Sequence, residues 1–266
     1  MKRISKLLSA ALLLLSAFQL SAQDPKYYGE FKISPQDNSV TIEKNVITIA
    51  PKKEAVQYEI TGYFNGQIVN KTKNTILKLN NAYIENTDGQ PAIYGEAKTE
   101  ISAKEDSVNY IISSGTSANK NAALHCKKNL EIGGKGTLYI QGKTYHGVKA
   151  DDVKIKGTGK FYFEGTKKGS CINCKTFTVE KGKTFTAYLS NAKNAIKADE
   201  TIFIDSGNFE ISGNSTVFKT DTKEDDPSSP HGIRLSGGVF KTSKNGTLYD
   251  TDKNAYKASG AKITEK

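Results

Sequence analysis

Tryptophan is absent from this chain of 266 residues, arginine occurs only as Arg3 and Arg234, and there are three cysteines. The absence of tryptophan argues against the broad flat aromatic surfaces expected of a protein that binds crystalline cellulose. Arginine supplies the bidentate fork that recognises phosphates and guanine edges, so its scarcity weakens a nucleic-acid interpretation. Three cysteines are too few for a disulfide scaffold, and their odd number leaves at least one thiol unpaired.

Long apolar runs are also missing after the first one, which extends from Leu7 to Leu20. It follows basic residues 1–6 and is followed by Ser21-Ala22, so residues 1–22 are predicted to be a secretory signal peptide and the protein to be secreted. The run is too short for a membrane span, and a buried N-terminal helix is the alternative. The remainder is predicted to form a single domain, 23–256, followed by a C-terminal tail, 257–266.

The charge is strongly positive, with a formal net charge of +10, and most of it comes from lysine. A basic protein attracts polyanions. Because export places it away from most nucleic acid, an acidic glycan is the expected partner. Lysine acts as a diffuse point charge, which suits a polymer held without tight register.

An internal repeat is visible in four segments, which run AALHCKKNLEI, HGVKADDVKI, SCINCKTFTV and NAIKADETIFI (122–132, 146–155, 170–179, 194–204). Their first apolar residues, Leu124, Val148, Ile172 and Ile196, follow one another at intervals of 24 residues. Weaker copies extend this column to Ile93, Phe218 and Leu248. Two further apolar columns keep the same step, one from Leu130/Ile132 through Val153/Ile155, the other from Leu138/Ile140 through Phe161/Phe163 to Phe185/Ala187.

Each column alternates apolar and polar residues with a period of two, as strands do, and glycine-rich turns separate the columns. A repeat of this length cannot bury its apolar face alone, whereas stacked copies form a continuous core. The sequence therefore predicts an all-β fold, a right-handed parallel β-helix (solenoid) with three strands per rung of about 24 residues. Residues 27–67 are expected to form entry rungs and an N-terminal cap. A sandwich of hairpins is the alternative, although hairpins have no reason to keep a 24-residue register.

The chain resembles a known family in the strings GQIV, TILKLNNAYIENTDGQPAIYG, AALHCKKNLEIGGKGTLYIQG and HGVKADDVKI (66–69, 75–95, 122–142, 146–155). These are similar, in the same order, to secreted carbohydrate-binding β-helix proteins that share the pectate-lyase architecture. The resemblance covers residues 40–250 and implies binding to polygalacturonate and cellulose, with calcium ions along the helix.

The chain departs from that family at its Asp-Gly-Ile-Lys turn. The positions that match the aspartate are His146, Ser170 and Asn194, in HGVK, SCIN and NAIK. These side chains are poor ligands for a hard cation that prefers carboxylate oxygens, which puts calcium at these turns in doubt. His146 and Asn194 are instead candidate carbohydrate-binding residues.

The residue after each first apolar position is expected to point outward, which gives the column His125, Lys149, Asn173, Lys197, Lys219. Residues one repeat apart lie roughly 4.8 Å apart in such a stack, so this column forms a largely basic ladder that could meet the carboxylates of a uronic acid polymer. The alternative is a row of ordinary solvated lysines. Paired acids at Asp151-Asp152 and Asp199-Glu200 are expected to be partners of Lys149 and Lys197 rather than metal ligands.

An acidic insertion at 221–230 interrupts the repeat, and it is the best candidate for binding calcium, through Asp221, Glu224, Asp225 and Asp226. His231 and Arg234 stand close to it in sequence. A calcium-dependent polysaccharide lyase would need a base to abstract a proton beside the uronate carboxyl group, and Arg234 is the arginine able to do so, although a lysine could take its place.

The preferred function is a non-catalytic module that binds an acidic, polygalacturonate-like polysaccharide through the lysine ladder. The lyase is one alternative, and a surface adhesion or structural β-helix is another. Tyrosines at 139, 145, 162 and 188 are candidates for stacking on sugars, but Tyr139 and Tyr162 lie one repeat apart and could stack on each other. The cysteines, Cys126, Cys171 and Cys174, are expected to be buried free thiols.

Overall fold

The computed structural model describes residues 24–116, 121–221, 231–243, 246–251 and 256–266. This part of the chain contains one short 3-10 helix, η1 (Pro25–Tyr28), and 25 strands that form one sheet. The antiparallel pairings between strands of this part of the chain are those of β1 with β4 and of β2 with β3, so the sheet is mostly parallel. The all-β prediction is confirmed. The predicted signal peptide, 1–22, lies outside the described residues.

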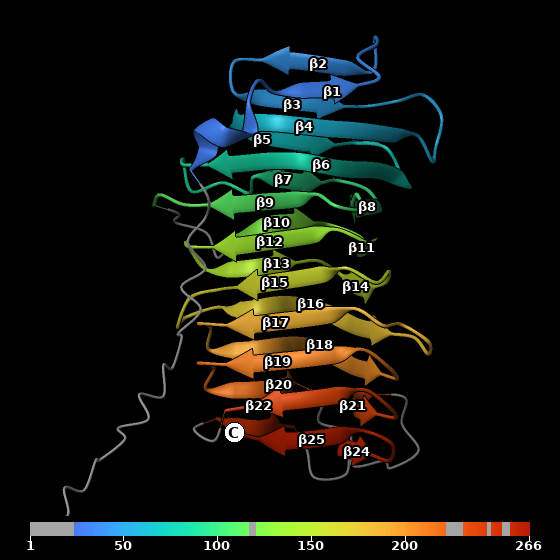
Figure 1. Cartoon of the computed structure of the whole chain (residues 1–266), viewed down its shortest axis with the longest axis vertical. Helices are drawn as coiled ribbons and strands as arrows, with labels where there is room; N and C mark the ends of the chain where they lie inside the picture. The colour runs from blue at the N-terminus through green and yellow to red at the C-terminus, as the bar shows by residue number, and fades with distance from the viewer. Residues whose placement is uncertain (1–23, 117–120, 222–230, 244–245, 252–255) are drawn as a thin grey trace, which may run out of the picture.

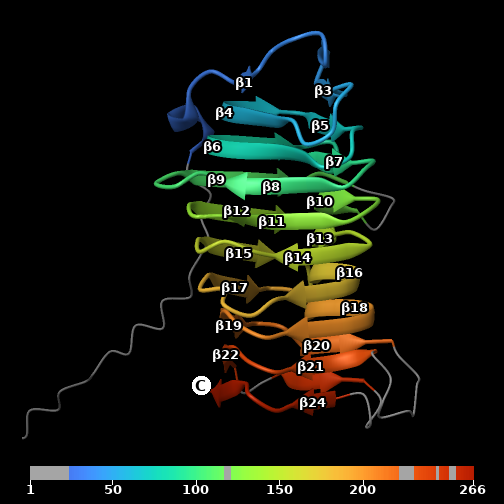
Figure 2. The same ribbon diagram turned by 90° about the vertical axis from the view of Figure 1, so that its right-hand side faces the viewer.

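The parallel strands pair into three stacks, which Figure 1 shows from the side and Figure 2 shows turned by 90°. The first stack holds β3 (Val46–Ile49), β5 (Gln67–Asn70), β7 (Ile93–Gly95), β10 (Ala122–Cys126), β13 (His146–Lys149), the first halves of β16 (Ser170–Val179) and β18 (Asn194–Ile204), β20 (Thr216–Thr220) and β23 (Thr247–Asp250).

The second stack holds the first halves of β4 (Gln57–Asn65) and β6 (Thr75–Asn86), then β8 (Thr99–Ala103), β11 (Leu130–Gly134), β14 (Asp152–Ile155), the second halves of β16 and β18, β21 (Gly232–Leu235) and β24 (Tyr256–Ala258). The third stack holds the second halves of β4 and β6, then β9 (Val108–Ser113), β12 (Thr137–Gly142), β15 (Lys160–Glu164), β17 (Thr186–Ser190), β19 (Asn208–Ser212), β22 (Val239–Thr242) and β25 (Lys262–Glu265).

Two antiparallel strands lie at the N-terminal end of the stacks. Strand β1 (Lys32–Ser34) pairs with β4, and β2 (Val40–Glu43) pairs with β3. At the other end, β24 and β25 pair with β21 and β22. Residues 257–266, which were expected to form a tail beyond the domain, therefore continue the second and third stacks.

The predicted 24-residue register is present in the first stack, where Leu124 pairs with Val148, Val148 with Ile172, and Ile172 with Ile196. Ile93 and Phe218 extend this column as predicted. The placement of Leu248 was wrong by one residue, because Phe218 pairs with Tyr249.

The third stack shows a similar correction. Phe161 pairs with Ala187 and Phe163 with Leu189, so the pairing expected with Phe185 and Ala187 was wrong by two residues. Phe185 lies in the preceding turn, but its side chain is fully buried and packs against Phe161 with ring centroids 5.8 Å apart. In the sequence, the buried turn residue Phe185 therefore looks like an inward-pointing strand residue, which explains the wrong pairing.

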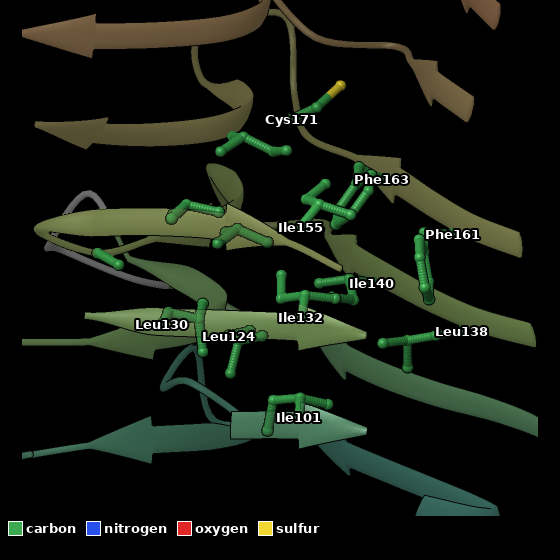
Figure 3. Packing of buried hydrophobic residues seen from close by; sticks show 14 of the residues in the cluster. Ile101, Leu124, Leu130, Ile132, Leu138, Ile140, Ile155, Phe161, Phe163 and Cys171 are labelled. Atoms are coloured by element: carbon green, nitrogen blue, oxygen red, sulfur yellow. The ribbon is translucent and has the colours of Figure 1, made fainter. Parts of the chain in front are cut away.

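The core fills the space between the three stacks. Figure 3 shows Leu124, Ile132 and Ile140, one from each stack, pointing inward from successive strands. All three are buried, and so are the large side chains of Phe161, Phe177, Phe209, Phe218 and Phe240. Because side chains alternate along a strand, the buried positions determine which residues of each strand point outward to the surface.

Candidate functional site

A cleft of about 290 Å³ lies on the outside of the first stack. Four consecutive strands, β13, β16, β18 and β20, and the turns before β13, β16 and β18 form it, so it extends over three strand steps, or roughly 14 Å, along the stack. Its lining residues are Tyr145, His146, Lys149, Lys168, Ser170, Asn173, Lys193, Asn194, Lys197 and Lys219.

Three buried polar side chains on successive strands, His146, Ser170 and Asn194, form part of the lining. The backbone N–H of Ser170 donates to Nδ1 of His146 (3.0 Å), and Nδ2 of Asn194 donates to Oγ of Ser170 (3.2 Å). An Nδ1 atom that accepts a hydrogen bond leaves the ring proton of a neutral histidine on Nε2. These contacts connect the starts of β13, β16 and β18, three of the four strands that form the cleft.

Gly142, just before this turn, allows the close approach that the site needs. A Cβ atom at this position would lie 1.6 Å from the carbonyl oxygen of His146. Only glycine fits there, because the obstacle is backbone and cannot rotate away.

The lysines of the cleft form two rows. The strand row consists of Lys149, Lys197 and Lys219, which are in register in the first stack with Asn173 between the first two. The turn row consists of Lys168 and Lys193, which are exposed and come just before β16 and β18. Together the two rows give the cleft five lysines and a positive charge.

The five lysines differ in their ionic partners. Nζ of Lys197 lies 2.6 Å from Oδ2 of Asp221 and 3.8 Å from Oδ1 of Asp199. Nζ of Lys219 contacts Oδ2 of Asp250. Lys149, Lys168 and Lys193 form no ion pair with any described residue, and we refer to these three as the open lysines.

The structure brings together six of the seven residues predicted to bind carbohydrate, namely His146, Lys149, Asn173, Asn194, Lys197 and Lys219. The seventh, His125, pairs with Lys149 in register but does not line the cleft. Its ring meets that of Tyr94 edge-on at 5.3 Å. Burial, together with the charges of Lys149 and Lys127, lowers the pKa of His125 to about 4, so this side chain is neutral near pH 7.

Sequence reasoning missed Lys168 and Lys193. Both lie in turns, one or two residues before the recurring position of Ser170 and Asn194. A lysine in that place in two successive repeats was the available signal. Tyr145 lines the cleft as well, where it meets the ring of His146 edge-on at 4.5 Å, so one of the four tyrosines considered for sugar stacking belongs to the site.

The other three tyrosines considered for stacking lie in the third stack, away from the cleft. Tyr139 and Tyr162 stack on each other at 4.3 Å, as the alternative interpretation had it, and Tyr162 stacks on Tyr188 at 4.4 Å. The same column continues through Tyr110, Tyr83 and Tyr63. Burial and the neighbouring phenols raise the pKa of Tyr162. This tyrosine ladder joins successive repeats from outside the core.

Of the four predicted calcium ligands, the structure describes one. Asp221 forms an ion pair with Lys197, and Glu224, Asp225 and Asp226 lie outside the described residues. No group of three or more His, Cys, Asp or Glu side chains that could hold a metal ion occurs in the described segments. His146, Ser170 and Asn194 bond to one another and offer no carboxylate, so the turns that match the calcium-binding positions do not fit this ion.

The remaining charged candidates lie in the second stack or in turns. Arg234 is on β21, where it is in register with Phe203 and Lys257, and it does not line the cleft. Of the paired acids, Asp199 contacts Lys197, whereas Glu200 contacts Lys175 (3.2 Å). Lys149 has no ion pair with Asp151 or Asp152, contrary to expectation. The three cysteines are buried free thiols, as predicted.

Comparison with known proteins places the chain in a family. Residues 38–184, more than half of the chain, match the family described as carbohydrate-binding domain-containing protein, and the chain belongs to this family. The matched region includes His146, Lys149 and Asn173, and the cleft continues beyond it. A search of curated proteins finds no match.

In the described segments no helix is long and apolar enough to cross a membrane.

A solved structure shares the fold. It is the structure of the polysaccharide lyase-like protein from C. thermocellum, a gadolinium derivative, with 17% sequence identity and a TM-score of 0.52. The match covers 86% of this chain and 88% of that chain. At this level of identity the likeness concerns the fold.

Proposed function

We propose that this protein is secreted and binds an acidic, polygalacturonate-like polysaccharide in the basic cleft, without catalysing a reaction. The three stacks are, in this proposal, the three faces of a right-handed parallel β-helix with three strands per rung of about 24 residues. Membership of a carbohydrate-binding family supports a glycan ligand. The observation that carries the acidic character is the grouping of five lysines around one elongated cleft.

The shape of the cleft favours a linear chain that runs along the first stack. The strand row of lysines lies on one side and the turn row on the other, so carboxylates that project to either side of the chain meet an ammonium group. Tyr145 at one end offers an aromatic ring against which a sugar can pack. The buried polar side chains of His146, Ser170 and Asn194 position these groups from below.

The proposal is tested by removing the charge of the open lysines. Replacing Lys149, Lys168 and Lys193 together by glutamine is expected to weaken retention of polygalacturonate in affinity electrophoresis at low salt. An exposed ion pair contributes roughly 0.2–1 kcal/mol, so the loss of three corresponds to about a 3- to 150-fold weaker affinity. Salt is expected to weaken wild-type binding, because exposed charges are screened over about 10 Å at 0.1 M.

The matched control replaces Lys52, Lys71 and Lys160 by glutamine, which removes the same charge from exposed positions outside the cleft. This variant is expected to bind nearly as well as the wild type. Equal weakening in both triple variants would show that net charge, and not the cleft, holds the polymer. A rise in ultraviolet absorbance from unsaturated products, when the protein is incubated with polygalacturonate and calcium, would support the lyase alternative instead.

A further inference from the structure

The two ends of the cleft differ in how their lysines are occupied. Lys197 and Lys219, on β18 and β20, contact the carboxylates of Asp221 and Asp250. The open lysines extend from β13 to the turn before β18, the strand that carries Lys197, and they form no ion pair with a described residue. One end is therefore cationic, whereas the other already holds carboxylate groups.

The geometry of the paired end resembles a lysine with a ligand carboxylate already bound. The side chains of Lys197 and Lys219 are 26% and 28% exposed, whereas those of Asp221 and Asp250 are 48% and 52% exposed. Lys197 and Lys219 thus line the cleft, whereas the more exposed Asp221 and Asp250 contact them without lining it. A uronate that reaches Lys197 or Lys219 competes with an aspartate for the ammonium group.

Exposed ion pairs are weak enough to be exchanged, since each contributes less than about 1 kcal/mol. Replacing one carboxylate by another around the same ammonium group gains little energy. Contacts at the paired end therefore add less to affinity than contacts with the open lysines. A chain that is already bound to the open lysines holds its other carboxylates at a high local concentration near the paired end, and only such a chain can displace the aspartates.

We propose that Asp221 and Asp250 are built-in competitors of the ligand, which divide the cleft into an open subsite at Lys149, Lys168 and Lys193 and a closed subsite at Lys197 and Lys219. This inference rests on the proposed function. A short acidic oligosaccharide occupies the open subsite alone, whereas a long chain also opens the closed subsite. The two aspartates thereby lower the affinity for long polymers without affecting short ones.

The test replaces both aspartates by asparagine in the full chain (Asp221→Asn with Asp250→Asn). Affinity for long-chain polygalacturonate, measured by isothermal titration calorimetry, is expected to rise about 2- to 30-fold, the equivalent of two exposed ion pairs. Affinity for trigalacturonate is expected to change less than about 2-fold, because this ligand does not reach the closed subsite.

A matched control is available in Glu180 and Glu210. They pair with Lys154 (2.6 Å) and Lys241 (3.2 Å), outside the cleft, and are 53% and 38% exposed. Replacing both by glutamine removes the same two negative charges and is expected to leave affinity for the long polymer within about 2-fold of the wild type. Equal tightening in this control, or none in the aspartate variant, overturns the inference.

A second measurement needs no variant. Acetylation of lysines in the wild type, read by mass spectrometry, is expected to be suppressed at all five cleft lysines by the long polymer and only at the open lysines by trigalacturonate. Labelling of Lys197 and Lys219 that stays unchanged with the long polymer contradicts the inference while leaving the proposed function intact. If the polymer protects none of the five lysines, the proposed function and the inference fail together.

Discussion

The ring of Tyr162 lies nearly parallel to the ring of Tyr188, with an angle of 6° between their planes and 4.4 Å between their centroids. Tyr139 stacks on the opposite face of Tyr162 at 4.3 Å. Both faces of this ring are therefore covered by rings from the neighbouring strands, β12 and β17.

Replacing Tyr162 by alanine removes both stacking contacts, and we expect it to lower the free energy of unfolding by about 2 kcal/mol. Tyr162→Phe keeps the rings and loses only the hydroxyl group, so its cost is expected to stay below about 1 kcal/mol. Urea denaturation of the two variants and the wild type measures both effects. Equal losses would show that the hydroxyl contacts, and not the stacked rings, stabilise the ladder.

Phe177 lies on the second stack between Val153 and Ile202, and its side chain is fully buried. Phe177→Ala is expected to destabilise the protein by about 3–5 kcal/mol, because it removes apolar contacts and leaves a cavity. Thr178→Ala, at the adjacent outward position, is expected to change stability by less than about 0.5 kcal/mol. A comparable loss for both, measured by thermal or urea unfolding, would contradict the inward assignment of Phe177.

Gly142→Ala is expected to disturb the cleft directly. The added Cβ atom would overlap the carbonyl group of His146, so the backbone at the start of β13 has to move. We expect a loss of more than about 2 kcal/mol in stability, together with weaker binding of polygalacturonate. In Gly182→Ala the Cβ atom meets nothing within 4 Å, and only its φ of +79° is unfavourable. This control is expected to cost about 1 kcal/mol and to bind normally.

The pH dependence of stability is expected to change when His125 is replaced. The pKa of His125 is about 4 in the folded protein, against 6.5 for the ordinary side chain, so the unfolded chain takes up a proton in this range before the folded chain does. Its contribution to stability is complete above pH 6.5 and is lost as the pH falls toward 4. His125→Gln is expected to flatten the curve of unfolding free energy against pH in this window. Parallel curves for the wild type and the variant would contradict this.

Much of the fold could be predicted because the repeat is regular where it matters. Leu124, Val148, Ile172 and Ile196 are equally spaced and alternate with polar residues, so they indicate both the strands and their stacking partners. The partners of Phe161, Phe163 and Phe218 were predicted wrongly because the turns between these strands differ in length. The full tyrosine ladder escaped notice for the same reason, since the steps from Tyr63 to Tyr83 and on to Tyr110 are not 24 residues.

The candidate site could be predicted to the extent that it lies on strands. Lys149, Asn173, Lys197 and Lys219 follow from the register alone. Lys168 and Lys193 are in turns, whose geometry the alternation of strands does not determine. The ion pair of Lys197 with Asp199 was predicted, whereas its pair with Asp221 and that of Lys219 with Asp250 required the structure, because Asp221 and Asp250 come from segments after the regular repeats.

Asn173 separates two positive charges that the fold would otherwise place side by side. With this neutral amide between them, Lys149 and Lys197 lie two strand steps apart, roughly 10 Å, a distance at which salt at 0.1 M largely screens their repulsion. Backbone pairing sets the spacing of the strands that carry these two lysines. If the cleft binds a polyanion as proposed, this spacing is expected to influence which polyanions bind, and Asn173→Lys, which adds a charge to the strand row, is expected to change their relative affinities.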